Sequence, residues 1–120
     1  MVKKLEIDGV HMTVGNDLRK YVHKKIGRLD KYIPKSSREV AHIEVKLKEG
    51  KAKDKQIRTC EVILHLPQET IMLSETTINM YAAVDIVEAK LKLRLQKYKR
   101  LHANPTLHRR LLARLKRQPA

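Results

Sequence analysis

The chain has 120 residues and a mass of 14.0 kDa, which suits one domain with a modest hydrophobic core. Lys and Arg number 27 against 13 Asp and Glu, so the formal charge is +14, which indicates a polyanionic partner such as nucleic acid or an anionic membrane surface. A single cysteine, Cys60, excludes an intramolecular disulfide and favours a reducing compartment. No apolar run approaches the roughly 18 residues of a membrane span. We therefore expect a soluble, cytoplasmic protein.

A strand and a helix are expected first along the chain. Apolar and charged residues alternate over 4–8, which predicts a strand ending at Gly9. Residues 15–17 provide a helix start, and the helix is expected to run to Tyr32. Its apolar stripe consists of Leu18, Val22, Ile26 and Leu29. One flank carries a continuous basic row of Lys20, Lys24, Arg28 and Lys31.

Three strands are expected next. Alternation over 40–48 predicts a strand, and the following residues, 49–55, predict a mobile hairpin loop. A strand over 57–66 and a shorter one over 70–74 complete the set. Cys60 falls on the apolar side of its strand, where a small buried thiol is far commoner than a reactive one.

A second helix is expected from Met80 to about Arg100. At about 100° per residue, its apolar residues form one stripe of Met80, Ala83, Val84, Val87, Leu91, Leu95 and Tyr98. One flank is cationic and carries Lys90, Arg94, Lys97 and Arg100. The other flank carries Asp85, Glu88 and Gln96. The helix therefore offers a buried face and a basic flank, although a helix of this kind can also carry lysines that are merely solvated.

The order of these elements constrains the architecture. A right-handed crossover makes the first two strands parallel neighbours, and short connections make the other pairs antiparallel. Both helices must bury their stripes, while the strands show polar residues at alternate positions. We therefore expect an α/β (α+β) fold, β-α-β-β-β-α, with two helices on one face of a four-stranded mixed sheet. Whether the two basic flanks adjoin is not fixed by the sequence.

The second helix resembles a motif of the ribosome hibernation-promoting factor and ribosome-associated inhibitor A family, in its short form. The resemblance covers roughly residues 2–101 and rests on Asn79-Met80-Tyr81-Ala82-Ala83-Val84-Asp85, Lys90-Leu91, Leu95 and Lys97-Tyr98-Lys99. It implies a shape similar to double-stranded-RNA-binding domains. It also implies a hibernation factor that binds the small ribosomal subunit and its rRNA, between head and body, where messenger and transfer RNA would lie, and so inhibits translation by idle ribosomes.

Candidate RNA-binding residues follow from the resemblance and from the basic row. Carried over residue by residue, the resemblance implies rRNA contacts by Lys24, Lys25, Arg28, Lys90, Arg94, Lys97, Lys99 and Arg100. The basic row of the first helix adds Lys20 and Lys31. The chain departs from the family pattern at Asn79, where Asp is usual, at Leu93-Arg94, where Arg-Gln is usual, and at Gly15, where Thr usually starts the helix.

Two units are expected along the chain. A ribosome-binding domain over 1–101 is followed by a basic tail over 102–120, either disordered or in a short helix. We expect a monomer off the ribosome. A membrane-surface role is disfavoured because both helices need their apolar stripes for the sheet.

Enzymatic chemistry finds little support in the sequence. The histidines show no spacing typical of a metal site, and no phosphate loop or nucleophile elbow is present, so we expect no enzyme, cofactor, metal or small-molecule substrate. His42 and His65 can meet across strands, but are expected to be water-facing side chains.

Base stacking on the sheet is also not expected. The chain has no Trp or Phe, and its four tyrosines fall in the expected helices, so recognition is expected to use shape and phosphate charge. The composition fits one alternative equally well: a constitutive rRNA-binding structural protein of the ribosome, or another non-enzymatic RNA-binding protein.

Overall fold

A computed structural model of the chain describes residues 4–102. The elements in chain order are β1 (Lys4–Val10), α1 (Asn16–Gly27), the 3-10 helix η1 (Arg28–Tyr32), α2 (Lys35–Arg38), β2 (His42–Ala52), β3 (Lys55–His65), β4 (Thr70–Thr77) and α3 (Met80–His102). The strands form one sheet in the order β1-β2-β3-β4. β1 and β2 are parallel, and the other neighbouring pairs are antiparallel. The predicted fold and topology are confirmed, whereas the predicted tail lies almost wholly outside the described residues.

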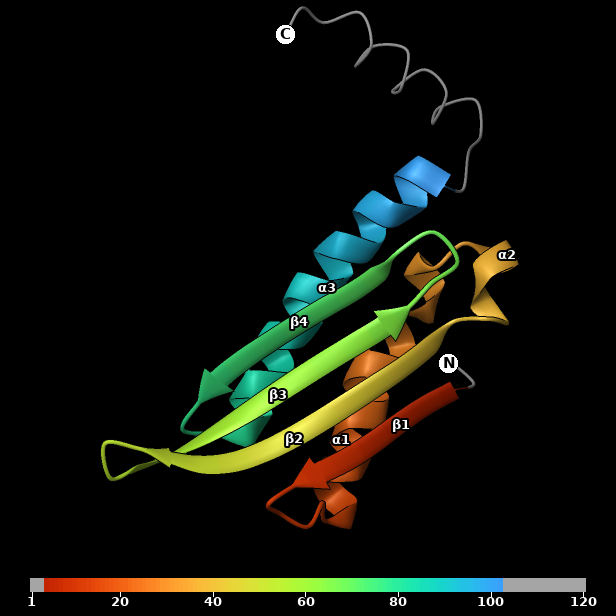
Figure 1. The fold of residues 1–120 in the computed structure, drawn as a ribbon. Helices are drawn as coiled ribbons and strands as arrows, with labels where there is room; N and C mark the ends of the chain where they lie inside the picture. Colours follow the sequence, from red (N-terminus) through yellow and green to blue (C-terminus); the bar gives the residue numbers. More distant parts are fainter. Residues whose placement is uncertain (1–3, 103–120) are drawn as a thin grey trace, which may run out of the picture.

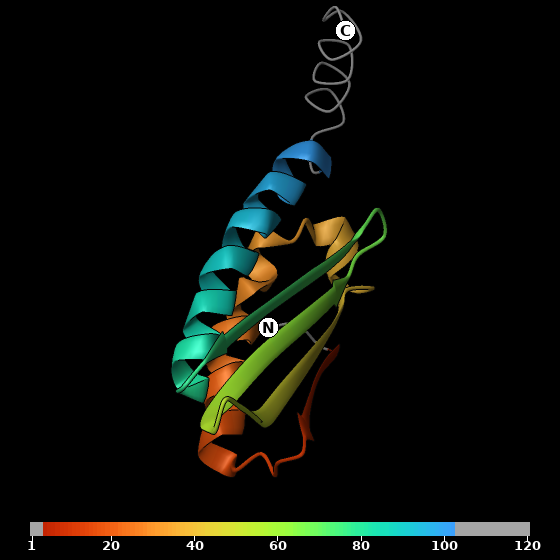
Figure 2. The same ribbon diagram turned by 60° about the vertical axis from the view of Figure 1, so that its left-hand side comes forward.

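The helices cover one face of the sheet. Figure 1 shows the four strands side by side, with α1 and α3 behind them, and Figure 2 shows both helices on the same side. α1 and η1 contact α3 directly. The opposite face of the sheet carries no helix in the described part of the chain, as expected from the alternation of the strands.

The hydrophobic core lies between the sheet and these helices. α3 buries the whole of its predicted stripe, which is at most 5 % exposed: Met80, Ala83, Val84, Val87, Leu91, Leu95 and Tyr98. α1 and η1, which together we call the first helical segment, bury Val22, Ile26 and Leu29. The strands contribute Ile43, Val45, Leu47, Cys60, Val62, Leu64 and Ile71. Burial raises the pKa of the Cys60 thiol to about 12, so this cysteine stays protonated and unreactive at neutral pH.

The first helix differs from its prediction. The α-helix ends at Gly27 and continues to Tyr32 as the 3-10 helix η1. Glycine weakens an α-helix, and the threefold repeat of a 3-10 helix brings Leu29 and Tyr32 to the same side. Leu29 thereby enters the core, with Tyr32 packed against it at the edge.

The expected loop over 49–55 is wrong. β2 and β3 pair as far as Ala52 and Lys55, so only Lys53 and Asp54 form the turn. Both have positive φ, 51° and 65°, which is the conformation of a type I′ hairpin turn. Asn-Gly is the usual sequence signal for that turn, so the pair Lys53-Asp54 did not indicate a two-residue turn.

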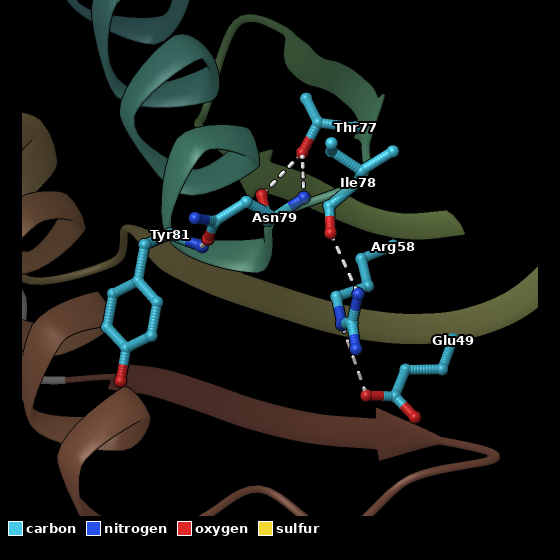
Figure 3. Close-up of polar contacts among 6 residues, drawn as sticks. All are labelled: Glu49, Arg58, Thr77, Ile78, Asn79 and Tyr81. Atoms are coloured by element: carbon cyan, nitrogen blue, oxygen red, sulfur yellow. Dashed lines mark hydrogen bonds and ion pairs between the residues drawn. The ribbon is translucent and has the colours of Figure 1, made fainter. Parts of the chain in front are cut away.

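The start of α3 is fixed by polar contacts to the end of β4 (Figure 3). The Asn79 side-chain oxygen accepts a hydrogen bond from the Tyr81 amide at 2.9 Å, so Asn79 is the N-cap that the helix needs. The Thr77 hydroxyl bonds to the backbone of Asn79, and Arg58 donates to the Ile78 carbonyl at 2.8 Å. Asn therefore serves at the position where the family usually has Asp.

Truncating Leu91 tests the packing of α3. We expect Leu91→Ala to lower the free energy of unfolding by about 2–5 kcal/mol, because this fully buried side chain would leave a cavity. Leu93→Ala is the matched control on the same helix, since Leu93 is 67 % exposed, and its effect should stay within about 0.5 kcal/mol. Urea denaturation measures both. Equal losses would contradict the orientation of α3.

Candidate nucleic-acid interface

The acidic flank of α3 faces α1. The Tyr21 hydroxyl donates a short hydrogen bond to Asp85, and Lys25 Nζ lies 3.8 Å from the same carboxylate. The Tyr81 ring, which points from α3 towards α1 in Figure 3, packs edge-on against Tyr21 with 4.9 Å between ring centroids. The helices are therefore joined by a polar and aromatic contact above the core, and Asp85 is a part of that contact.

This contact perturbs Tyr21. The hydrogen bond to Asp85 is the main cause that raises the pKa of Tyr21 from 10.0 to about 12, and burial and the charges of Asp85 and Glu88 add to it. An ionised phenol would face two carboxylates here, so the protonated form is favoured. The resulting stabilisation is fully present below pH 10 and is lost as the pH rises towards 12.

A basic groove runs between the first helical segment and α3. Its charged lining consists of five cations and one carboxylate: Lys24, Lys25, Arg28, Lys31, Lys92 and Glu88. Tyr32 forms part of the wall, and its ring centre lies 5.2 Å from Lys31 Nζ and 5.5 Å from Lys92 Nζ. These cation–π contacts hold the two ammonium groups over one ring. We call this feature the interhelix groove.

Basic side chains continue from the interhelix groove in both directions. On the outer side of α1, Asn16, Arg19, Lys20, His23, Lys24 and Arg28 line a second hollow. Towards the end of α3, Lys99 Nζ lies 3.4 Å from the Lys31 carbonyl, and Arg100 lines a further hollow with Lys99. Within residues 4–102, Lys20, Lys24, Arg28, Lys97 and Arg100 form no ion pair.

The predicted basic flank of α3 does not adjoin the basic row of α1. Lys90 pairs with Glu75 of β4, and Arg94 lies 3.9 Å from Glu69, which precedes β4. This flank therefore lies along the β4 side of α3, whereas the Asp85 and Glu88 flank lies towards α1. The structure thus brings together Lys20, Lys24, Lys25, Arg28, Lys31, Lys99 and Arg100. It places Lys90, Arg94 and, by the helical period, Lys97 apart from them.

Sequence reasoning missed Lys92. It lies on the same flank of α3 as Asp85 and Glu88, which looked acidic and was not expected to carry contacts. The helical period could have placed it there, but nothing in the sequence says which flank of α3 packs beside α1. The four tyrosines do lie in the helical segments, as expected: Tyr21, Tyr32, Tyr81 and Tyr98.

Comparison with known families identifies the chain. The sequence profile of the Sigma 54 modulation protein / S30EA ribosomal protein family matches residues 5–102. The chain belongs to this family. The expected resemblance is thereby confirmed, and it covers nearly all the described residues.

Two curated relatives support the S30EA assignment. The ribosome hibernation promotion factor of Staphylococcus aureus (strain COL) is 31 % identical over 96 residues, which cover 80 % of this chain and 48 % of that protein. The ribosome hibernation promotion factor of Lactococcus lactis subsp. cremoris (strain MG1363) is 35 % identical over 104 residues, which cover 85 % and 53 %. The chain thus spans about half the length of these relatives.

Solved structures share the fold of this S30EA chain. The Thermus thermophilus Protein Y N-terminal domain superposes with a TM-score of 0.63 and 24 % identity, covering 78 % of this chain and 94 % of that one. A ribosomal subunit interface protein from Coxiella burnetii gives the same TM-score and identity, with 80 % and 97 % coverage.

None of the described helices has the length and apolar character needed to cross a membrane.

The link between Asp85 and Tyr21 can be tested by titration. We expect Asp85→Asn to return the pKa of Tyr21 from about 12 towards 10.0, because the charged hydrogen-bond acceptor is lost. Midway between these values, Tyr21 should be mostly protonated in the native chain and mostly ionised in the variant. Tyrosine ring carbon shifts measured by NMR report this, with Tyr21→Phe for assignment.

Glu88→Gln is the control for that titration. Glu88 raises the pKa of Tyr21 through charge alone and more weakly than Asp85 does, so its removal should shift the titration much less. An unchanged Tyr21 titration in Asp85→Asn would contradict the helix contact.

Proposed function

We propose that this chain is a cytoplasmic, ribosome-binding hibernation factor that inhibits translation. Its helix-covered face would bind rRNA of the small ribosomal subunit along the path of messenger and transfer RNA. Membership of the S30EA family and the names of the curated relatives support the ribosomal partner. The observation that carries the proposal is the interhelix groove, with five cations and one carboxylate in its charged lining.

The chemistry of the groove suits a phosphate backbone. Lysine and arginine side chains neutralise phosphates and release counterions, which gives affinity without reading base sequence. Lys24 and Arg28 are free of ion pairs within the described residues, so RNA would not have to displace a carboxylate from them. Lys90 and Arg94 would have to give up Glu75 and Glu69, and should contribute less for that reason.

Base stacking has little part in this mechanism. Tyr98 is fully buried, Tyr32 lies beneath two ammonium groups, and Tyr21 is held by Asp85. Only Tyr81, at 41 % exposure, offers a partly free aromatic surface among the described tyrosines. Recognition would therefore depend on the shape of the helix pair and on its charge.

Charge reversal in the groove tests the mechanism. We expect Lys24→Glu combined with Arg28→Glu to weaken binding to purified small subunits. The plot of log affinity against log salt should become shallower by about 1.5, because each lost phosphate contact removes roughly 0.7–0.9 from the slope. Melting temperature should change little, since both side chains are exposed.

Two matched variants complete this experiment. Lys46→Glu with Lys55→Glu makes the same change in formal charge on the opposite face of the sheet, and should cost much less affinity. Lys90→Gln with Arg94→Gln should cost less than neutralising Lys24 and Arg28 with Gln. Equal losses from the groove and sheet variants would mean only a diffuse polycation effect.

Growth-phase dependence separates the proposal from its alternative. A hibernation factor should co-sediment with ribosomal particles mainly in stationary-phase lysates. A constitutive rRNA-binding structural protein would instead accompany small subunits in equal amounts in growing and stationary cells.

A further inference from the structure

Four side chains with possible metal-ligand atoms lie together on the open face of the sheet. Register places Glu6 of β1 beside Glu44 of β2, and His42 of β2 beside His65 of β3. His42 Nε2 lies 3.6 Å from Glu6 Oε1, and His65 Nε2 lies 3.0 Å from Glu44 Oε2. The two imidazole centroids are 5.5 Å apart. These residues alternate with Ile43 and other core residues, so they face away from the helices.

The Nε2 atom of His42 is a buried polar atom that lacks a hydrogen bond to any described residue. A buried nitrogen without a hydrogen-bond partner costs free energy, so a group that takes up its lone pair would be favoured there. One ligand atom each from Glu6, His42 and Glu44 lies within 4.8 Å of the other two.

We propose that Glu6, His42 and Glu44 bind a divalent transition-metal ion of the Zn²⁺ class. Imidazole with carboxylate suits Zn²⁺, Ni²⁺ or Co²⁺ rather than Mg²⁺. Tetrahedral bonds of about 2.0–2.2 Å place neighbouring ligand atoms roughly 3.3–3.6 Å apart, which the His42–Glu6 separation of 3.6 Å already matches. The three ligand atoms all lie within 4.8 Å of one another, so binding would draw the Glu44 oxygen closer to the other two. Two carboxylates balance the charge of the ion.

His65 acts as a positioning residue for this site. Its Nε2 lies 3.0 Å from Glu44 Oε2, and this hydrogen bond orients the Glu44 carboxylate. The ligands come from two strands, β1 and β2, and His65 adds β3. The ion would tie the edge strand β1 to the sheet, on the face opposite the interhelix groove, so this inference does not rest on the proposed function.

Titration of the tag-free full chain with Zn²⁺ tests the site. We expect isothermal titration calorimetry to show binding of one ion by the native chain that His42→Asn weakens by about tenfold or more. Glu44→Gln should act in the same direction. His23→Asn, on α1, is the matched control and should leave the affinity unchanged. Cys60 is fully buried and should not compete for the ion.

Thermal unfolding gives an independent readout. Zn²⁺ should raise the melting temperature of the native chain and of His23→Asn, because the ion binds the folded sheet, but should raise that of His42→Asn much less. Melting in EDTA verifies that the variants fold. The proposal is overturned if the native chain binds no Zn²⁺, or if His42→Asn and the native chain bind it equally well.

Discussion

The burial of one stripe of α3 determines where both charged flanks of this helix are placed. Seven residues of that stripe pack against the sheet and the first helical segment, so the rotation of the helix about its axis is fixed. The Asp85 and Glu88 flank then lies towards α1, and the Lys90 and Arg94 flank lies along β4. A rotation of α3 by one residue, about 100°, would turn one of these charged flanks into the core at a cost of several kcal/mol.

This orientation gives the two helices a joint cationic surface with an acidic anchor inside it. Asp85 binds Tyr21 and Lys25 and holds α1 close to α3. The cations that line the interhelix groove, Lys24, Arg28 and Lys92 among them, remain available to a partner. The carboxylates near β4 instead offset Lys90 and Arg94. The basic side chains on the α1 side of α3 are therefore available to a partner, whereas those on the β4 side are partly neutralised by carboxylates.

The sequence predicted the fold well because the period of its apolar residues is unambiguous in both helices and in the strands. It predicted the basic row of α1 for the same reason. It did not show which flank of α3 meets α1, because that choice depends on tertiary packing, and Lys92 was missed as a result. The hairpin over 49–55 was predicted, but its turn is only Lys53 and Asp54, and the length was wrong because the turn lacks the Asn-Gly or Asp-Gly pair that marks a two-residue turn. The His42 and Glu6 cluster is also invisible to spacing along the chain, since only the sheet register joins residues so far apart.

Amine labelling of the complex with the small ribosomal subunit tests the central claim most directly. Each lysine of the unmodified chain reports its own accessibility to an amine-reactive reagent, and mass spectrometry of the peptides compares free and bound protein. We predict that Lys24, Lys31 and Lys92 become protected on binding, whereas Lys46 and Lys55 on the open sheet face react at unchanged rates. Protection of Lys46 and Lys55 with continued labelling of the groove lysines would contradict it.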